Sequence, residues 1–194
     1  MIAIEINSGQ LKRLRVATGK AKKSFGKELA AAINQTAKKT RLNIGRDIRK
    51  TVNLKKDKVE KQISLRVTAT SETPRAVVSL SESAREGLQH FGARQDKRGV
   101  SYKISKQGGR KRVNGAFMGP KPGQLAPKLY GGVFKRATKM RLPIIKLYGV
   151  SPFGAYAKND FESIEVVFIS KNLQAQIDRR INLNILRANG LVKR

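Results

Sequence analysis

The sequence contains no cysteine and only one histidine among its 194 residues. The absence of cysteine excludes disulfide bonds and thiolate metal sites. Metal sites of the common kinds need several histidine, cysteine or acidic ligands that converge, and His90 has only Glu86 near it in the sequence. We therefore expect no metal and no cofactor, and we interpret His90 as a partly buried, locally bonded side chain.

Long apolar runs are also missing. No stretch of about 18 or more apolar residues occurs, which is the length that a membrane-spanning helix needs. The first residues, "MIAIEINSGQ", lack the pattern of a signal peptide because Glu5 interrupts them and the basic region follows them. These absences predict a soluble protein without membrane contact that works where it is made or assembled.

Acidic residues are scarce, with 13 Asp and Glu against 42 Lys and Arg and a net charge of +29. A compact chain with this charge repels itself, so we expect an anionic partner such as nucleic acid, a membrane surface or an acidic protein. The one acidic cluster is Asp160, Glu162 and Glu165. Carboxylates at the start of a helix suit its dipole, whereas a Mg²⁺-dependent nuclease would need carboxylates from several elements. We therefore expect a protein that is not an enzyme, with the nuclease as an alternative.

Apolar residues recur every three or four positions across residues 8–51, which is the period of an amphipathic helix. Glycine weakens a helix by about 1 kcal/mol, so we expect a break near Gly19 and a long helix after it, with Ser8 as a first N-cap. The opposite face is basic and is either solvated or faces phosphates. The apolar positions are Phe25, Leu29, Ile33, Ala37, Leu42, Ile44 and Ile48.

Two further helices follow from the same pattern. A short one is expected over residues 53–65, with Asn53 as its cap and with Val59 and Ile63 facing inward. The chain is predicted to become helical again from about residue 159. Four-residue steps of apolar side chains and a stop at Gly190 define that last helix, and the side chains are Leu173, Ile177, Ile181 and Ile185.

The sequence pattern in the middle of the chain predicts strands. Alternation of apolar and polar residues predicts a hairpin over residues 64–81, and residues 112–119 and 131–138 are candidate strands. Residues 141–154 are expected to be extended because proline disrupts a helix interior. The sequence thus predicts a single α+β domain over residues 1–194, in which long N-terminal and C-terminal helices bracket a small antiparallel sheet.

Residues 92–123 form a basic, glycine-rich segment whose one acidic residue is Asp96. Such a segment cannot bury enough apolar surface to fold alone, so we interpret it as an extended arm, with a solvated hairpin tip as the alternative. Its cations could follow a phosphate backbone or bind carboxylates, and no motif for base-specific readout appears. The candidate contact residues are Arg94, Lys97, Arg98, Lys103, Lys106, Arg110, Lys111 and Arg112.

Three segments occur in a recognisable order: "NLKKDKVEKQISLRVTAT", then "RVNGAFMG", then "VFKRATKMRLPIIKLYGVSP". In this order and at this spacing they resemble the minor tail protein Z family of tailed bacteriophages, the tail-completion proteins. The resemblance implies a structural virion protein at the head-proximal end of the tail, in the neck or head–tail connector. It also implies host cytoplasm as the place of virion assembly.

The resemblance further implies a hexameric ring around a channel that holds the genomic DNA, contacted through its backbone. The expected neighbours are tail terminator and tail tube proteins on one side and head-closure or portal-associated proteins on the other. A free nucleic-acid-binding protein without sequence specificity is the alternative. The arm would line the channel or reach a neighbouring ring, and the candidates for subunit packing are Leu142, Pro143, Ile144, Ile145, Tyr148 and Pro152.

Overall fold

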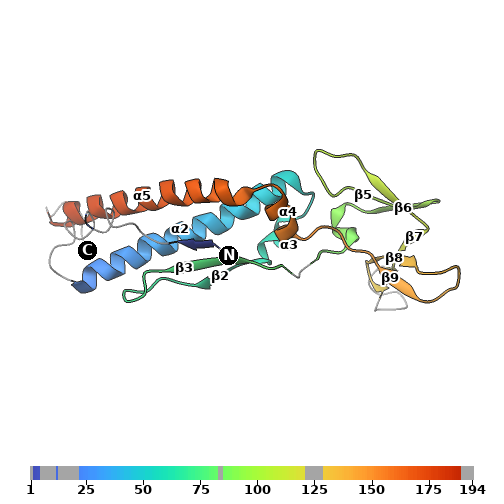
Figure 1. Ribbon diagram of the computed structural model, residues 1–194, viewed down its shortest axis with the longest axis horizontal. Coiled ribbons are helices and arrows are strands. Elements are labelled where there is room, and N and C mark those ends of the chain that lie inside the picture. Colours follow the sequence, from blue (N-terminus) through green and yellow to red (C-terminus); the bar gives the residue numbers. More distant parts are fainter. Residues whose placement is uncertain (1, 5–11, 13–21, 83–84, 121–128, 189–194) are drawn as a thin grey trace. The chain divides into compact units, whose positions relative to one another are not determined.

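The chain has an α+β fold, seen in a computed structural model that describes residues 2–4, 12, 22–82, 85–120 and 129–188 (Figure 1). Long helices lie near both ends of the chain and small antiparallel sheets lie between them, which confirms the predicted fold class. None of the helices in these ranges is long and apolar enough to cross a bilayer. The helices are α2 (Lys22–Thr51), α3 (Lys56–Glu60), η1 (Leu88–Phe91, a 3-10 helix), α4 (Pro152–Lys158) and α5 (Phe161–Ala188).

The strands form three separate three-stranded antiparallel sheets, with the orders β1-β3-β2, β4-β5-β6 and β7-β8-β9. The first three strands are β1 (Ile2–Ile4), β2 (Ile63–Val67) and β3 (Ala76–Leu80). The others are β4 (Arg94–Asp96), β5 (Gly99–Tyr102), β6 (Lys111–Asn114), β7 (Ala116–Met118), β8 (Val133–Arg136) and β9 (Ile144–Lys146).

The chain divides into two compact units, each built from separate stretches of sequence. The first unit holds most of α2, the sheet β1-β3-β2 and α5. The second holds the last turns of α2, then α3, η1, the other two sheets and α4. The first comprises residues 1–44, 63–80 and 160–194, and the second comprises residues 45–62 and 81–159.

The first unit is held together by the apolar stripes that the sequence predicted. Ile33 and Ala37 of α2 are fully buried, as is Ile177 of α5, and Leu173 is nearly so. Leu42 is an exception, with 48% of its surface exposed, because it lies about half a turn out of phase with Ile33 on the helix.

Helices α2 and α5 of the first unit run side by side in opposite directions (Figure 1). Asn43 Nδ2 donates a hydrogen bond to Glu165 Oε1 at 2.9 Å. Further along, Arg180 forms an ion pair with Glu28 at 2.6 Å. The helix is also tied to the segment after β2, since the Asn34 side chain both donates to and accepts from the peptide of Ala69, at 2.8 and 2.7 Å.

The second unit packs around Phe91, Val100 and Val133, which are fully buried. Its two sheets are connected through Gln95, whose Oε1 accepts a hydrogen bond from the backbone N–H of Met118 at 2.8 Å. Gly149 lies against the ring of Phe91 so closely that a Cβ would overlap it. The close packing explains how a unit with so much charge retains an apolar interior.

Several local predictions are confirmed. The hairpin over residues 64–81 is β2 and β3, and the long helix after Gly19 is α2. Val59 of α3 is buried as predicted, and Ile63 is buried too, but α3 ends at Glu60 and Ile63 opens β2.

Two other local predictions are wrong. The cap position of α3 is Lys55, while Asn53 Nδ2 donates to the carbonyl of Lys103 instead. Pro152 does not extend the chain: it opens α4 at the first helical position, where a missing N–H costs nothing, and the Ser151 hydroxyl accepts from Gly154 N as a cap. The expectations for Ser8, Gly19 and Gly190, and for the side chains of Phe25 and Ile185, lie outside the described residues.

Candidate nucleic-acid interface

The basic segment that the sequence presented as an extended arm is folded over residues 94–118. It forms the sheet β4-β5-β6 and continues directly into β7. Arg94 pairs with Ser101, and Ser101 with Arg112, so these three side chains lie in one row on one face of the sheet. Residues 121–123 of the predicted arm lie outside the described residues.

The turn between β4 and β5 explains how so charged a segment reverses direction. Asp96 Oδ1 accepts the backbone N–H of Arg98 at 2.9 Å, which closes the turn over Lys97. Gly99 follows with a φ of 147°, a conformation that L side chains rarely adopt. A Cβ on Gly99 would also overlap the carbonyl oxygen of Val113. A glycine at this position is therefore needed for the strand to leave the turn.

The segment after β5 is anchored to residues distant in sequence. Lys103 N donates to the carbonyl of Phe91 at 3.0 Å, and Lys106 N donates to that of Thr51, at the end of α2, at 2.9 Å. Asn53 N donates to Ile104 O at 2.7 Å. The backbone that carries Lys103 and Lys106 is thereby held in place, in contrast to a free arm.

Two of the eight candidate cations are engaged within the unit. The Arg110 guanidinium donates to the carbonyl of Gly92 at 2.7 Å and to that of Ser101 at 3.0 Å. Arg112 forms an ion pair with Asp96 at 2.8 Å. The N–H of Arg98 and, secondarily, the charge of Arg112 hold the pKa of Asp96 below its ordinary value, so this carboxylate stays ionised. Arg110 and Arg112 thus stabilise the sheet.

The remaining six cations have no side-chain hydrogen bond or ion pair among the described residues. Five of them are exposed and Lys103 is half-buried. We call these six residues the basic sheet cluster: Arg94, Lys97, Arg98, Lys103, Lys106 and Lys111. Unpaired cations on a backbone that strands and long-range hydrogen bonds hold in place are suited to a polyanion, because phosphate contacts require charge and position but no base recognition.

The residues predicted to pack between subunits are mostly exposed. Leu142, Ile145 and Tyr148 are 66%, 54% and 51% exposed. Pro143 is exposed as well, and Ile144 is half-buried. Pro152 is buried in its own unit and is therefore unavailable to a partner. The first five remain candidates for a subunit contact.

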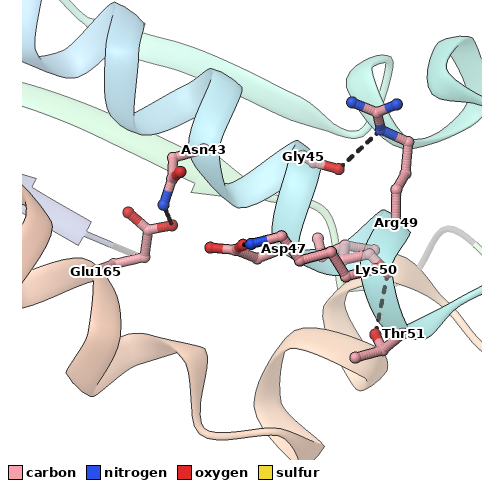
Figure 2. Close-up of polar contacts among 8 residues, drawn as sticks. Asn43, Gly45, Asp47, Arg49, Lys50, Thr51 and Glu165 are labelled. Carbon is pink, nitrogen blue, oxygen red and sulfur yellow. Dashed lines mark hydrogen bonds and ion pairs between the residues drawn. The ribbon is translucent and has the colours of Figure 1, made fainter.

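The three residues of the acidic cluster, Asp160, Glu162 and Glu165, have different environments in the fold. Glu165 is fully buried and receives the hydrogen bond of Asn43, as Figure 2 shows. Glu162 lies exposed in the first turn of α5, and Asp160 Oδ2 accepts from the Ser163 hydroxyl at 2.9 Å. Within the described residues, no three His, Cys, Asp or Glu side chains form a group that could hold a metal ion. The described chain gives the nuclease alternative no support.

Polar side chains near the end of α2 also form contacts within the helix itself. Asp47 forms an ion pair with Lys50 at 2.6 Å, and Arg49 donates to the carbonyl of Gly45 at 3.0 Å (Figure 2). These contacts engage two of the cations on the basic face of α2. Lys27, Lys38 and Arg46 of the same helix are exposed.

His90 is partly buried, with its Nε2 at 3.7 Å from Glu86 Oε2. Burial and the charge of Lys58 lower the pKa of His90, and the carboxylate of Glu86 raises it by less. This environment agrees with the locally bonded histidine that the sequence predicted.

In the turn between β8 and β9, Leu142 and Pro143 were predicted contact residues but the residues just before them were not. Lys139 and Arg141 are exposed there beside Met140, which is 75% exposed. The signal was available in "KRATKMRLPIIK", residues 135–146, which carry five cations and no acid.

Comparisons with protein-family models, with curated proteins and with solved structures find no match to this chain.

Proposed function

We propose that the protein is a structural component of a bacteriophage head–tail connector, completing the head-proximal end of the tail as a ring around the DNA channel. The observation that carries the proposal is the basic sheet cluster. Its six cations have no partner among the described residues, and they lie on a backbone fixed by strands and by contacts with Phe91 and Thr51. The order of segments that resembles tail-completion proteins gives this cluster its context.

A ring that surrounds DNA needs positive charge on its inner surface and no recognition of bases. Backbone contacts by Lys and Arg release counterions and tolerate any sequence. A backbone held in place keeps each of these cations at the same position in every subunit. A net charge of +29 would also be offset once phosphate occupies the channel.

The proposed ring further requires contacts between subunits. Leu142, Ile145 and Tyr148 expose apolar surface that a neighbouring subunit would cover. The expected neighbours in the particle remain the tail terminator and tail tube proteins and the head-closure or portal-associated proteins.

Electron microscopy and native mass spectrometry of the purified chain test the proposal. We expect closed rings of one stoichiometry, six subunits, that bind double-stranded DNA through the basic sheet cluster. Deletion of the chain from the particle that encodes it should leave heads and tails unjoined. A chain that stays monomeric at high concentration, and whose loss still yields joined particles, would contradict the proposal.

The basic sheet cluster is also compatible with a free nucleic-acid-binding protein without sequence specificity. That function requires tight, steeply salt-dependent DNA binding by the monomer. The connector proposal instead expects strong binding only after assembly, when the clusters of several subunits act on one duplex. Measurement of DNA affinity below and above the concentration at which rings form separates the two functions.

A further inference from the structure

One face of the sheet β7-β8-β9 carries aromatic rings together with cations. Phe117, Phe134 and Lys146 lie opposite one another on the three strands, so their side chains share this face. Arg136 lies two residues after Phe134 and therefore points the same way. The Phe117 and Phe134 rings are stacked with 6.1 Å between their centroids, and the Arg136 guanidinium lies 5.6 Å from the centroid of the Phe117 ring. The face thus combines an apolar floor with cations.

Tyr148 extends this face beyond the end of β9. Leu147 N donates to Val133 O at 2.8 Å, which continues the register of β8 and β9 and places Tyr148 opposite Gly132. Gly132 has no side chain that could cover the tyrosine. Lys146 Nζ lies 5.6 Å from the centroid of the Tyr148 ring, and 51% of the surface of Tyr148 is exposed. We call four residues of this face the aromatic sheet surface: Phe117, Arg136, Lys146 and Tyr148.

No acid of the same sheet offsets the charge of the aromatic sheet surface. Residues 97–159, which include all three strands, contain neither Asp nor Glu. Glu86 lies beside the residue that pairs with Tyr148, but its carboxylate accepts a hydrogen bond from Gln62 at 2.9 Å and lies 3.9 Å from Lys58 Nζ. The two cations of the surface are exposed and form no ion pair among the described residues. They remain available to an anionic ligand.

This combination suits single-stranded nucleic acid better than duplex DNA. The unpaired bases of a single strand stack on exposed aromatic rings, while Lys and Arg bind the phosphates. Bases within a duplex are already stacked on one another, so they present only their edges to a protein. An exposed tyrosine beside two cations therefore adds a contact that only a single strand can use.

We propose that the aromatic sheet surface binds single-stranded nucleic acid, with a base stacked on Tyr148 and neighbouring phosphates on Lys146 and Arg136. This site goes beyond the proposed function, which assigns duplex DNA to the basic sheet cluster. Ile145 points to the opposite face of β9. Ile145 and Leu142 therefore stay available to a neighbouring subunit, whereas Tyr148 is assigned to nucleic acid.

Loss of the tyrosine ring tests the stacking contact. The variant is Tyr148→Leu, which keeps an apolar side chain, and the matched control is Tyr102→Leu in the sheet β4-β5-β6. The ligands are a single strand made as DNA and as RNA, an abasic strand and a duplex, each of about 12 nucleotides, a length that one such site can cover.

We expect Tyr148→Leu to weaken binding of the single strand about 5- to 100-fold in fluorescence anisotropy. Binding of the abasic strand and of the duplex should stay unchanged, because neither offers a free base to the tyrosine. The control should bind all ligands like the wild type. A loss with either the DNA or the RNA strand supports the site, and the tighter of the two identifies the nucleic acid that it takes.

Removal of the two cations gives a second readout. The variant R136Q/K146Q removes the cations of the surface, and the control K139Q/R141Q removes two exposed cations from the turn of the same hairpin, so the two have equal net charge. Each phosphate contact on a single strand contributes about 0.7 to the slope of log affinity against log salt concentration. We expect R136Q/K146Q to lower this slope for the single strand by about 1.4 and the control to leave it unchanged.

A Tyr148→Trp variant reports stacking directly, because the chain contains no tryptophan. The single strand should quench its fluorescence, and the abasic strand should not. Circular dichroism shows whether each variant is folded. A folded Tyr148→Leu variant that binds the single strand like its control, or a folded Tyr148→Trp variant that is not quenched, would overturn the site.

Native mass spectrometry of Tyr148→Leu separates this site from a subunit contact. Lost assembly with unchanged single-strand binding would overturn the site and assign the tyrosine to a neighbouring subunit. Duplex binding by the basic sheet cluster and ring formation by the wild type are measured independently of these variants. Failure of the single-strand site would therefore leave the connector proposal standing.

Discussion

Among single residues, Gly99 is the one on which the shape of the basic sheet most depends. Its φ of 147° and its approach to the Val113 carbonyl leave no room for a side chain. Gly99→Ala should lower the free energy of unfolding by about 1–3 kcal/mol. The control is Gly109→Ala, because nothing lies within 4 Å of a Cβ there. Denaturant unfolding of both variants checks the prediction, and equal stabilities would contradict it.

His90 is expected to make the protein less stable in acid. Burial and Lys58, with Lys146 and Lys55, lower its pKa below 6.5, and Glu86 compensates only in part. A histidine with a lowered pKa in the folded state stabilises the fold above its unfolded pKa, and that contribution is lost as pH falls through the folded pKa. We expect the single imidazole to titrate below 6.5 by NMR.

The same reasoning predicts the behaviour of a variant. His90→Gln should lose less thermal stability than the wild type between about pH 7.5 and about pH 5, because it binds no proton there. Melting curves at the two pH values provide the comparison. An equal loss in both proteins would show that His90 does not contribute.

At the scale of elements, Asn34 connects α2 to the segment that follows β2. Its side chain makes both hydrogen bonds to the peptide of Ala69 in a partly buried setting. Asn34→Ala should therefore cost about 1–3 kcal/mol, because two backbone groups lose their partner. Its neighbour Gln35, half-buried and without a side-chain hydrogen bond among the described residues, is the control. Gln35→Ala should change stability by at most about 0.5 kcal/mol, and a similar loss in both variants would be evidence against the connection.

The elements with a local periodic signal were predictable from sequence. The stripe of Leu29, Ile33 and Ala37 identifies α2, and the steps of Leu173 and Ile177 identify α5. The alternation in residues 64–81 identifies the hairpin β2–β3 in the same way. In each case, residues close in sequence determine which face is buried.

The candidate strand over residues 112–119 covers most of β6 and all of β7, but the sheet β4-β5-β6 as a whole was not predictable in this way, because its stability comes from partners distant in sequence. The backbone of residues 103–106 is held by hydrogen bonds with Thr51, Asn53 and Phe91. The composition of the segment does not predict these contacts. The cations of the candidate site could be found from sequence. Which of these cations form contacts within the unit could not be predicted, because Arg110 donates hydrogen bonds to Gly92 and Ser101, which are distant from it in sequence.

For the whole molecule, two basic surfaces could in principle contact a polyanion, and they can be compared directly. The sheet variant R94Q/K97Q/R98Q removes part of the basic sheet cluster. The helix variant K27Q/K38Q/R46Q removes exposed cations of α2 in equal number. Each phosphate contact contributes about 0.9 to the slope of log affinity against log salt concentration. The sheet variant should thus lower that slope by about 2 to 3, and the helix variant should leave it unchanged.

Fluorescence anisotropy with labelled duplex DNA over a series of salt concentrations measures both slopes. A lower slope for the helix variant alone would assign the DNA contact to α2. Equal affinities for unrelated DNA sequences are expected in either case, since backbone contacts carry no base recognition.

The account as a whole attributes the excess of cations to assembly around an anionic partner. An electron-microscopy map of the intact particle, with the chain located in it, tests this claim most directly. We expect a ring at the junction of head and tail in which the basic sheet cluster faces DNA or an acidic neighbour. A chain whose cluster faces bulk water, with neither polynucleotide nor acidic protein beside it, would contradict the account.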